Sequence, residues 1–433
     1  GYAGSLYLQQ SDGAFIAVAL PSDMGSINCF DSDAHFLDVD KDQDLDLLVT
    51  RWTPLPNSNT DVSGMVLYLN DGAGRFSQSP PETLPAVLPF INCMAVEDVT
   101  GDGNLDIYLG GGSVPGKYPL GSPGYLFIRE GERWMDQTPE VLKRQPWIVE
   151  DALWSDVDTD GQKELLLATQ YGSVKLLRRQ NEVWFDQTKE AGLDERKGWW
   201  NAIAAADLDG DGDEDFVLGN RGSNTPSQAT SSHPDWLIYG DMDANGRPEL
   251  VEAYTENNVL YPRRGFDALS RSMPFLRQKF INFHQFSTSG IASMFSKEAI
   301  QKAYHLQINT IESGVLLNQG NFSFMFTPLP RMVQTAPIND IALGDINQDG
   351  MVDMIVAQND FSPQSMHGRM DGGVSMLLQG KGDGFFEPVP SRHSGITVAG
   401  EARSISITDI NGDGKPDIVF GSPGESLKTF MHQ

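Results

Sequence analysis

The sequence predicts an all-β protein, a seven-bladed β-propeller with a mostly helical insertion. Three observations support this fold class. A nine-residue acidic pattern recurs seven times along the 433 residues. Short apolar segments, typical of buried strands, flank the copies. The chain also has 44 glycines and 25 prolines, which favour many turns and hence many short strands. A length beyond the roughly 250–300 residues of one compact core fits an architecture that grows by repetition.

The pattern reads D-x-[DNT]-x-[DN]-G-x-x-[DE], with one imperfect copy. In chain order, the first to seventh loops span residues 38–46, 98–106, 156–164, 207–215, 241–249, 345–353 and 409–417. Each copy fits the turn of a β-hairpin, and units of several strands match the blades of a propeller. In each blade we expect an inner strand, a loop, a second strand, and an outer hairpin closed by a Gly turn.

The chemistry of the pattern indicates Ca2+, at up to seven sites with a mainly structural role. Oxygens at positions 1, 3, 5 and 9 suit this ion, and position 7 can add a backbone carbonyl. Position 6 needs a left-handed backbone, which Gly permits. Gln43 at this position must be strained or bend differently, and Thr100 at position 3 is a poorer ligand, so we expect the first two sites to be weaker or differently built. The candidate ligands are Asp38, Asp40, Asp42, Asp46, Asp98, Thr100, Asp102, Asp106, Asp156, Asp158, Asp160, Glu164, Asp207, Asp209, Asp211, Asp215, Asp241, Asp243, Asn245, Glu249, Asp345, Asn347, Asp349, Asp353, Asp409, Asn411, Asp413 and Asp417.

Two spacings break the rhythm of the repeat. Only 34 residues separate the starts of the fourth and fifth loops, whereas 104 separate those of the fifth and sixth. We expect the fifth loop on an outer hairpin of the fourth blade. Residues 263–305 are expected to form the helical insertion, because apolar residues around Ala299 and Ala303 have helical spacing. N- and C-terminal strands are expected to close residues 1–433 into one propeller domain. Six or eight blades are the alternatives.

Composition excludes several classes of protein. The 59 acidic and 31 basic residues give a net charge of -28, which argues against nucleic acid as a partner. No apolar run approaches the roughly 20 residues of a membrane helix. Cys29 and Cys93 allow one disulfide or two buried thiols. The chain begins with Gly1 rather than Met, so we expect a processed chain or a part of a longer one.

The blade order places all the loops on one face of the propeller and the long connections on the other. We expect this second face to bind a protein or glycan, because aromatic and Arg side chains anchor interfaces. The alternative is that the tryptophans pack between blades and the bases pair with nearby acids. The residues gathered there are Arg51, Trp52, Lys117, Tyr118, Trp147, Lys197, Trp199, Trp200, Arg221, His233, His367 and Arg369.

No catalytic constellation stands out in the sequence. The histidines form no HExxH motif, and there is no G-x-S-x-G nucleophile elbow. Residues 111–117 resemble a P-loop only superficially, because Tyr118 replaces its Ser or Thr. We therefore expect a non-enzymatic binding module. The alternatives are a subunit of a larger cell-envelope assembly and a carbohydrate-active enzyme such as a polysaccharide lyase.

The repeats resemble FG-GAP/VCBS repeats, the calcium-loop propeller repeats also found in the heads of integrin α-subunits. More closely, the chain resembles the C-terminal propeller half of large secreted bacterial proteins with VCBS and ASPIC/UnbV regions. Residues 114–119, 151–156, 198–207, 261–264, 273–277 and 317–320 carry this resemblance, which extends over nearly the whole chain. It implies a seven-bladed, calcium-binding propeller that is secreted or held at the cell surface, and it implies no defined activity.

Overall fold

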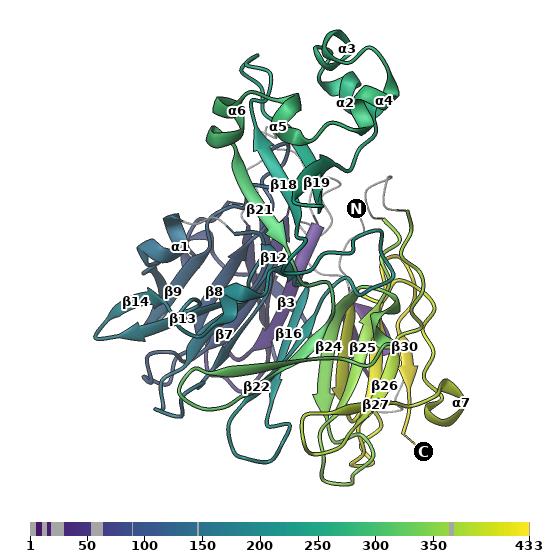
Figure 1. Ribbon diagram of the computed structural model, residues 1–433. Helices are drawn as coiled ribbons and strands as arrows, with labels where there is room; N and C mark the ends of the chain where they lie inside the picture. Colours follow the sequence, from purple (N-terminus) through teal and green to yellow (C-terminus); the bar gives the residue numbers. More distant parts are fainter. Residues whose placement is uncertain are drawn as a thin grey trace.

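The computed structural model describes residues 6–10, 15–18, 30–52, 64–88, 90–144, 147–362 and 368–432. Antiparallel strands dominate these ranges, and Figure 1 shows them as several sheets with a smaller part projecting from one side. The fold is therefore a propeller-like β fold, in agreement with the predicted all-β class. In the described residues no helix is long and apolar enough to cross a membrane.

Six antiparallel sheets follow one another along the chain, each with a predicted loop between its first two strands. The first contains β3 (Phe30–Leu37), β4 (Asp46–Trp52), β5 (Met65–Asn70) and β6 (Phe76–Gln78); the second β7 (Ile91–Glu97), β8 (Asp106–Gly111), β9 (Tyr125–Glu130) and β10 (Arg133–Asp136); the third β11 (Val149–Ser155), β12 (Glu164–Gly172), β13 (Lys175–Gln180) and β14 (Val183–Asp186). The fourth contains β16 (Ala202–Ala206), β17 (Asp215–Gly219), β22 (Gly314–Asn318) and β23 (Phe324–Pro328); the fifth β24 (Ile338–Gly344), β25 (Asp353–Gln358), β26 (Met376–Gly380) and β27 (Phe386–Pro388); the sixth β28 (Ser404–Thr408), β29 (Asp417–Gly421) and β30 (Lys428–Phe430).

Short elements connect these sheets. They are η1 (Pro81–Thr83), α1 (Glu140–Arg144), η2 (Leu193–Glu195), η3 (Val333–Thr335) and α7 (Ser391–Ser394). In addition, β15 (Gly198–Trp199) pairs with the end of β12 as a fifth strand of the third sheet.

The core lies between successive sheets rather than in one central mass. The second strands are almost continuously apolar and buried, as expected for strands covered on both faces. Leu48 of the first sheet packs in one cluster with Ile107 of the second. Similar clusters join the second to the third sheet, the third to the fourth, the fourth to the fifth and the fifth to the sixth. The sheets are therefore stacked face to face, as blades are.

The first strands meet through half-buried carboxylates on alternate sheets. Asp33 of β3, Asp151 of β11 and Asp340 of β24 each accept a backbone N–H from the first strand of the following sheet. The three carboxylates also act on one another, since Asp340 and Asp33 both help to raise the pKa of Asp151. First strands from sheets one, three and five therefore converge on a common region.

Residues 220–313 form an insertion between β17 and β22 of the fourth sheet, and we call it the inserted subdomain. Its own sheet has the order β20-β19-β18-β21, and in Figure 1 it projects from the rest of the molecule together with five short helices. These elements are β18 (Asp235–Gly240), β19 (Glu249–Glu256), β20 (Val259–Pro262), α2 (Phe266–Ser272), α3 (Leu276–Lys279), α4 (Phe283–Ser287), α5 (Ile291–Met294), α6 (Lys297–Lys302) and β21 (Tyr304–Ile308).

The inserted subdomain changes two expectations from the sequence. The fifth loop does not lie on an outer hairpin of the fourth sheet; it connects β18 to β19 of the subdomain sheet. The helices do fall within residues 263–305, but the insertion around them is longer and includes four strands. Seven blades were expected, whereas the main series of the described residues contains six sheets, and the sheet with the fifth loop lies outside that series. Its strands have the same local pattern as a blade, so periodicity does not distinguish them.

The N-terminal hairpin contacts both ends of the series. It contains β1 (Leu6–Gln9) and β2 (Phe15–Val18). The side-chain amide of Gln9 donates a hydrogen bond to the carbonyl of Ile410 in the seventh loop. Leu8 lies against the turn after β5, where a Cβ on Gly74 would come within 2.2 Å of it. The hairpin thus bridges the first and sixth sheets, while closure by strand pairing stays a prediction.

Candidate metal centres and the opposite face

All seven loops share one backbone conformation. Position 6 has φ between 76° and 95°, and position 4 has φ between 56° and 79°. Gln43 follows the same path as the glycines, with φ 76°. Of the two outcomes expected for the first loop, the structure shows strain rather than a different bend, because a side chain at positive φ crowds the backbone.

Hydrogen bonds within the loops hold this conformation. In every loop the N–H of position 6 donates to the carboxylate of position 1, as Gly212 does to Asp207 at 3.1 Å. The position 1 side chain thus turns into the loop, and the residues that follow wrap around it.

Position 9 has a second role that the sequence did not reveal. Five loops have a fully buried Asp there, and both of its oxygens accept backbone N–H groups. Asp215, for example, accepts from Leu208 at 2.9 Å within the loop and from Asn318 at 2.8 Å on the third strand of the sheet. In these five loops position 9 therefore fastens the loop to its sheet and leaves only the remaining lone pairs for a cation.

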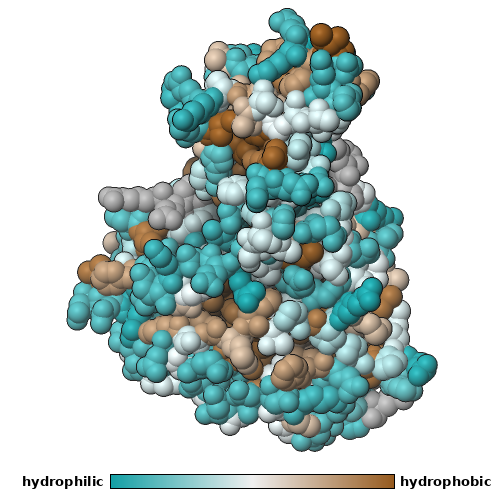
Figure 2. All heavy atoms as spheres, in the orientation of Figure 1, coloured by the Kyte–Doolittle hydropathy of each residue, from teal (hydrophilic) through white to brown (hydrophobic). Residues whose placement is uncertain are grey.

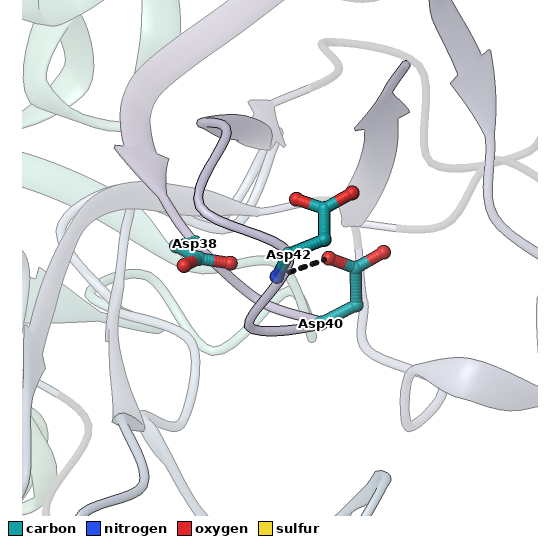
Figure 3. A group of neighbouring side chains, drawn as sticks. All are labelled: Asp38, Asp40 and Asp42. Carbon is teal, nitrogen blue, oxygen red and sulfur yellow. Dashed lines mark hydrogen bonds between the residues drawn. The ribbon is translucent and has the colours of Figure 1, made fainter. Parts of the chain in front are cut away.

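Four loops bring three acidic side chains together, with ligand oxygens within 4.8 Å of one another, and these groups can hold a metal ion. They are Asp38, Asp40 and Asp42; Asp156, Asp158 and Glu164; Asp207, Asp209 and Asp215; and Asp241, Asp243 and Glu249. Figure 3 shows the first group, where the N–H of Asp42 donates to Asp40. Desolvation and neighbouring acids raise the pKa of Asp40 and of Asp209, as expected for crowded carboxylates.

The donor set of these loops fits a hard cation. Oδ1 of Asp38 and Oδ1 of Asp158 are buried and have no hydrogen-bond partner among the described residues. A buried carboxylate oxygen without a partner is costly, and an ion such as Ca2+ removes that cost. The loops therefore fit the ion that their sequence pattern predicted.

The second, sixth and seventh loops differ at position 3, where they have Thr100, Asn347 and Asn411. The amides of Asn347 and Asn411 donate to the position 5 carboxylates at 3.0 and 3.1 Å. In the second loop Lys41 reaches across from the first loop and places its ammonium 3.0 Å from Asn104. These three loops contain fewer acidic oxygens. Among them, the sequence predicted a weaker site only for the second loop, at Thr100, and that stays a prediction.

Two residues expected on the binding face are buried instead. Arg51 is 6% exposed, and its guanidinium binds Asp31 at 3.3 Å and the Tyr68 hydroxyl at 3.1 Å. Trp200 is 1% exposed and packs in the core between the third and fourth sheets. For these two residues the alternative reading, packing between sheets and pairing with acids, is correct.

Three of the expected residues come together, but the inserted subdomain covers them. The Arg221 guanidinium lies 3.0 Å above the ring of Trp199, and Trp199 packs on Tyr171 with ring centroids 4.4 Å apart. Tyr118 hydrogen-bonds with Tyr171, and burial raises the pKa of both phenols. Leu237 of β18 and Ile308 of β21 belong to the same cluster. The face opposite the loops therefore supports the subdomain at this point.

The other predicted residues are more scattered. Trp52 is half-buried, and its indole donates to the Ser113 carbonyl at 3.2 Å. The ammonium of Lys175 lies over the ring of Trp147. Lys117, His233 and Arg369 are exposed, Lys197 is half-buried, and His367 lies outside the described residues. Cys93 is buried, which raises the pKa of its thiol, and Cys29 lies outside the described residues, so their pairing stays untested.

The fold and the loops together define a repeat protein of propeller-like β architecture whose loops can hold metal ions. Family models agree with this class. A model described as an FG-GAP-like repeat matches residues 38–109 and 156–218, and a model described as an FG-GAP repeat matches residues 402–429. The matched segments contain the first four loops and the seventh. The chain therefore contains FG-GAP-type repeats.

A curated relative and several solved structures are also similar. Cartilage acidic protein 1 of Xenopus tropicalis is 25% identical over 293 residues, which cover 64% of this chain and 40% of that protein. The chain thus spans about two fifths of the length of this relative. The V. cholerae biofilm matrix protein Bap1 has 10% identity over 91% of this chain and 84% of that one, with a TM-score of 0.31. A rhamnogalacturonan lyase of Bacillus licheniformis has 12% identity over 98% and 74%, with a TM-score of 0.35.

Proposed function

We propose that this chain is a calcium-stabilised extracellular binding module that performs no reaction of its own. The observation that carries the proposal is the convergence of three carboxylates in each of four loops that share one conformation. Extracellular calcium modules bind at roughly 10⁻⁴–10⁻³ M, so the calcium outside cells would fill such sites. Each ion also offsets part of a net charge of -28, which otherwise opposes the compact state.

Within this proposal the six sheets form a ring, and the inserted subdomain presents the binding surface for a protein or glycan. Two apolar side chains of the subdomain are strongly exposed: Ile281 is 86% and Phe283 is 63% exposed. Phe283 also borders a cavity of about 290 Å³ whose other walls include Tyr254, Tyr261 and Phe266. Figure 2 shows apolar side chains on this projecting part of the molecule. Exposed aromatic groups beside a hollow are typical of binding sites.

Binding by wild-type protein and by the Phe283→Ser variant, measured in calcium against a panel of polysaccharides and extracellular proteins, tests this proposal. Met135→Ser is the matched control, since Met135 is an exposed apolar residue on β10 of the second sheet. We expect partners that bind wild type and the control but bind the subdomain variant more weakly. Equal binding by all three proteins would place the surface elsewhere, and turnover of a polysaccharide would favour the enzyme alternative.

A further inference from the structure

The third loop differs from the others because a positive side chain already contacts its carboxylates. Arg178 of β13 places Nη2 at 2.7 Å from Asp158 Oδ2 and 2.8 Å from Asp160 Oδ2. Its Nε lies 3.6 Å from Glu164 Oε1. Asp158 and Glu164 are two of the three acidic residues that this loop brings together as metal ligands. The guanidinium thus binds oxygens that a cation would need.

The position of Arg178 in its sheet explains how it reaches the loop. By the strand register, Arg178 lies opposite Glu164, which is position 9 of the third loop. The same register places Leu69, Ile128, Leu317 and Met431 opposite position 9 of the first, second, fourth and seventh loops. In the sixth loop the corresponding residue is Gln379, and its amide donates to Asp349 at 3.2 Å. A long polar side chain opposite position 9 therefore reaches the loop. Among the six main sheets, Arg178 is the charged residue at this position.

Two further contacts favour this arrangement. The Arg178 guanidinium stacks over the ring of Phe322 in the neighbouring fourth sheet, 4.7 Å from its centroid. Position 9 is a Glu in this loop rather than an Asp, and only its Oε2 accepts a backbone N–H, from Val157 at 3.0 Å. Its other oxygen is left facing Arg178. The longer acid, the arginine and the stacked ring form one arrangement that the other five loops of the main sheets lack.

We propose that Arg178 is a built-in counterion of the third loop, which keeps this loop closed without metal and weakens its binding of Ca2+. A guanidinium and a Ca2+ ion repel each other strongly at such distances, so calcium must displace Arg178 to use these oxygens. Oδ1 of Asp158 stays without a partner among the described residues, so the guanidinium does not replace every contact a cation would make. Arg178 thus raises the calcium concentration that the third loop needs to fill. This inference rests on the proposed calcium binding of the other loops.

The test compares Arg178→Leu with Arg179→Leu in the full chain. The first variant reproduces the Leu found at this register position in the first and fourth sheets. The second removes the same charge from the next residue, which pairs with Glu182 on the β13–β14 hairpin and not with the loop. Arg178→Gln is a second variant, which copies the Gln379 found at this position in the fifth sheet. Native mass spectrometry counts bound Ca2+ against free calcium, and thermal unfolding in EGTA measures stability without metal.

We expect Arg178→Leu to fill one more site than wild type at calcium concentrations about tenfold lower than the wild-type third loop needs. In EGTA we expect its Tm to fall by about 3 °C, because three acidic groups lose their partner, while Arg179→Leu changes neither property. Calcium curves and EGTA melting equal to wild type would overturn the inference. If wild type binds no Ca2+, the proposed function fails, and the Tm difference in EGTA still decides the counterion role.

Discussion

The Asp33 carboxylate accepts a hydrogen bond from the backbone N–H of Met94 at 2.8 Å, across the boundary between the first and second sheets. Its other oxygen accepts the N–H of Ala34 in its own strand. Asp151 and Asp340 repeat this arrangement toward Ile203 and Ile405. Carboxylates on alternate sheets therefore join the six sheets in three pairs.

Asp33→Ala should lower the free energy of unfolding by about 1–3 kcal/mol, because two backbone donors lose their acceptor. Chemical denaturation in calcium buffer measures this change. The control is Asp371→Ala, since Asp371 is exposed and contacts only the nearby Arg369 in the salt bridges of the described residues. Such a surface change should stay within about 0.5 kcal/mol. Equal effects of the two variants would mean that the bridge between sheets is not a stabilising contact.

Stability without metal should fall as the pH rises from about 4 to about 7. Burial, together with the charges of Asp340 and Asp33, raises the pKa of Asp151 to about 7. The folded chain then holds a proton that the unfolded chain has already released, so raising the pH favours unfolding. Between about pH 5.5 and 7.5 this one group removes up to about 2 kcal/mol.

Asp151→Asn removes the titrating proton and keeps an acceptor for the Ile203 N–H. Its unfolding free energy in EGTA should therefore depend less on pH than that of wild type. Denaturation curves at several pH values measure the two slopes. Identical slopes would show that Asp151 titrates at the same pH in the folded and unfolded chain. Burial also raises the pKa of Glu150 to about 7. The Glu150→Gln variant should therefore also make the unfolding free energy depend less on pH.

Gln43→Gly should stabilise the protein by about 0.5–1 kcal/mol. Glycine removes the strain of a side chain at positive φ, which stabilises the folded chain. Part of this gain is lost because glycine has more conformational freedom in the unfolded chain. The matched reverse change is Gly212→Gln in the fourth loop, where φ is 95° and an added Cβ would meet no atom within 4 Å. It should destabilise by a similar amount. Unfolding measured with and without calcium checks both, and a loss of stability in Gln43→Gly would show that the side chain of Gln43 makes a contact worth more than the strain.

Trp199→Ala should loosen the inserted subdomain. Trp199 packs between Tyr171 and Arg221 and belongs to the apolar cluster that includes residues of β18 and β21. Its removal therefore takes away contacts that hold the subdomain sheet on the main sheets. We expect faster amide hydrogen exchange in β18 and β21, with the first to third sheets unchanged. Lys117→Ala, at an exposed position of the same face, should leave exchange as in wild type. Unchanged exchange in the Trp199 variant would mean that other contacts hold the subdomain.

Much of the fold could be predicted because each loop is a local structure. The spacing of acids and glycine determines its turns, and the flanking apolar runs require buried strands. The extent of the insertion could not be predicted, because β18 and β19 flank a loop of the same pattern as a blade. The fourth sheet is distinguished from the subdomain sheet by the pairing of β17 with β22, which lie about a hundred residues apart in the sequence.

The candidate site was predicted in part for a similar reason. Ligand types follow from the nine positions of a loop, whereas the partners of those ligands come from other strands. Arg178 was missed because its relation to Glu164 depends on strand register. Aligning the third strands of the repeats would have shown a charge where Leu69 and Leu317 stand. Likewise, the sequence placed Arg51 and Trp200 in exposed connections. Arg51 instead lies in β4 and is held by Asp31 and Tyr68 of its own sheet, and Trp200 is buried between the third and fourth sheets.

The proposed function requires that the loops bind calcium and that this binding stabilises the fold. The most direct measurement counts Ca2+ ions on the wild-type chain by native mass spectrometry and compares its Tm in millimolar calcium and in EGTA. We predict several bound ions, with the fourth loop among the first to fill, and a clearly lower Tm in EGTA. A chain that binds no Ca2+ and melts at the same temperature in both buffers would contradict the proposed function.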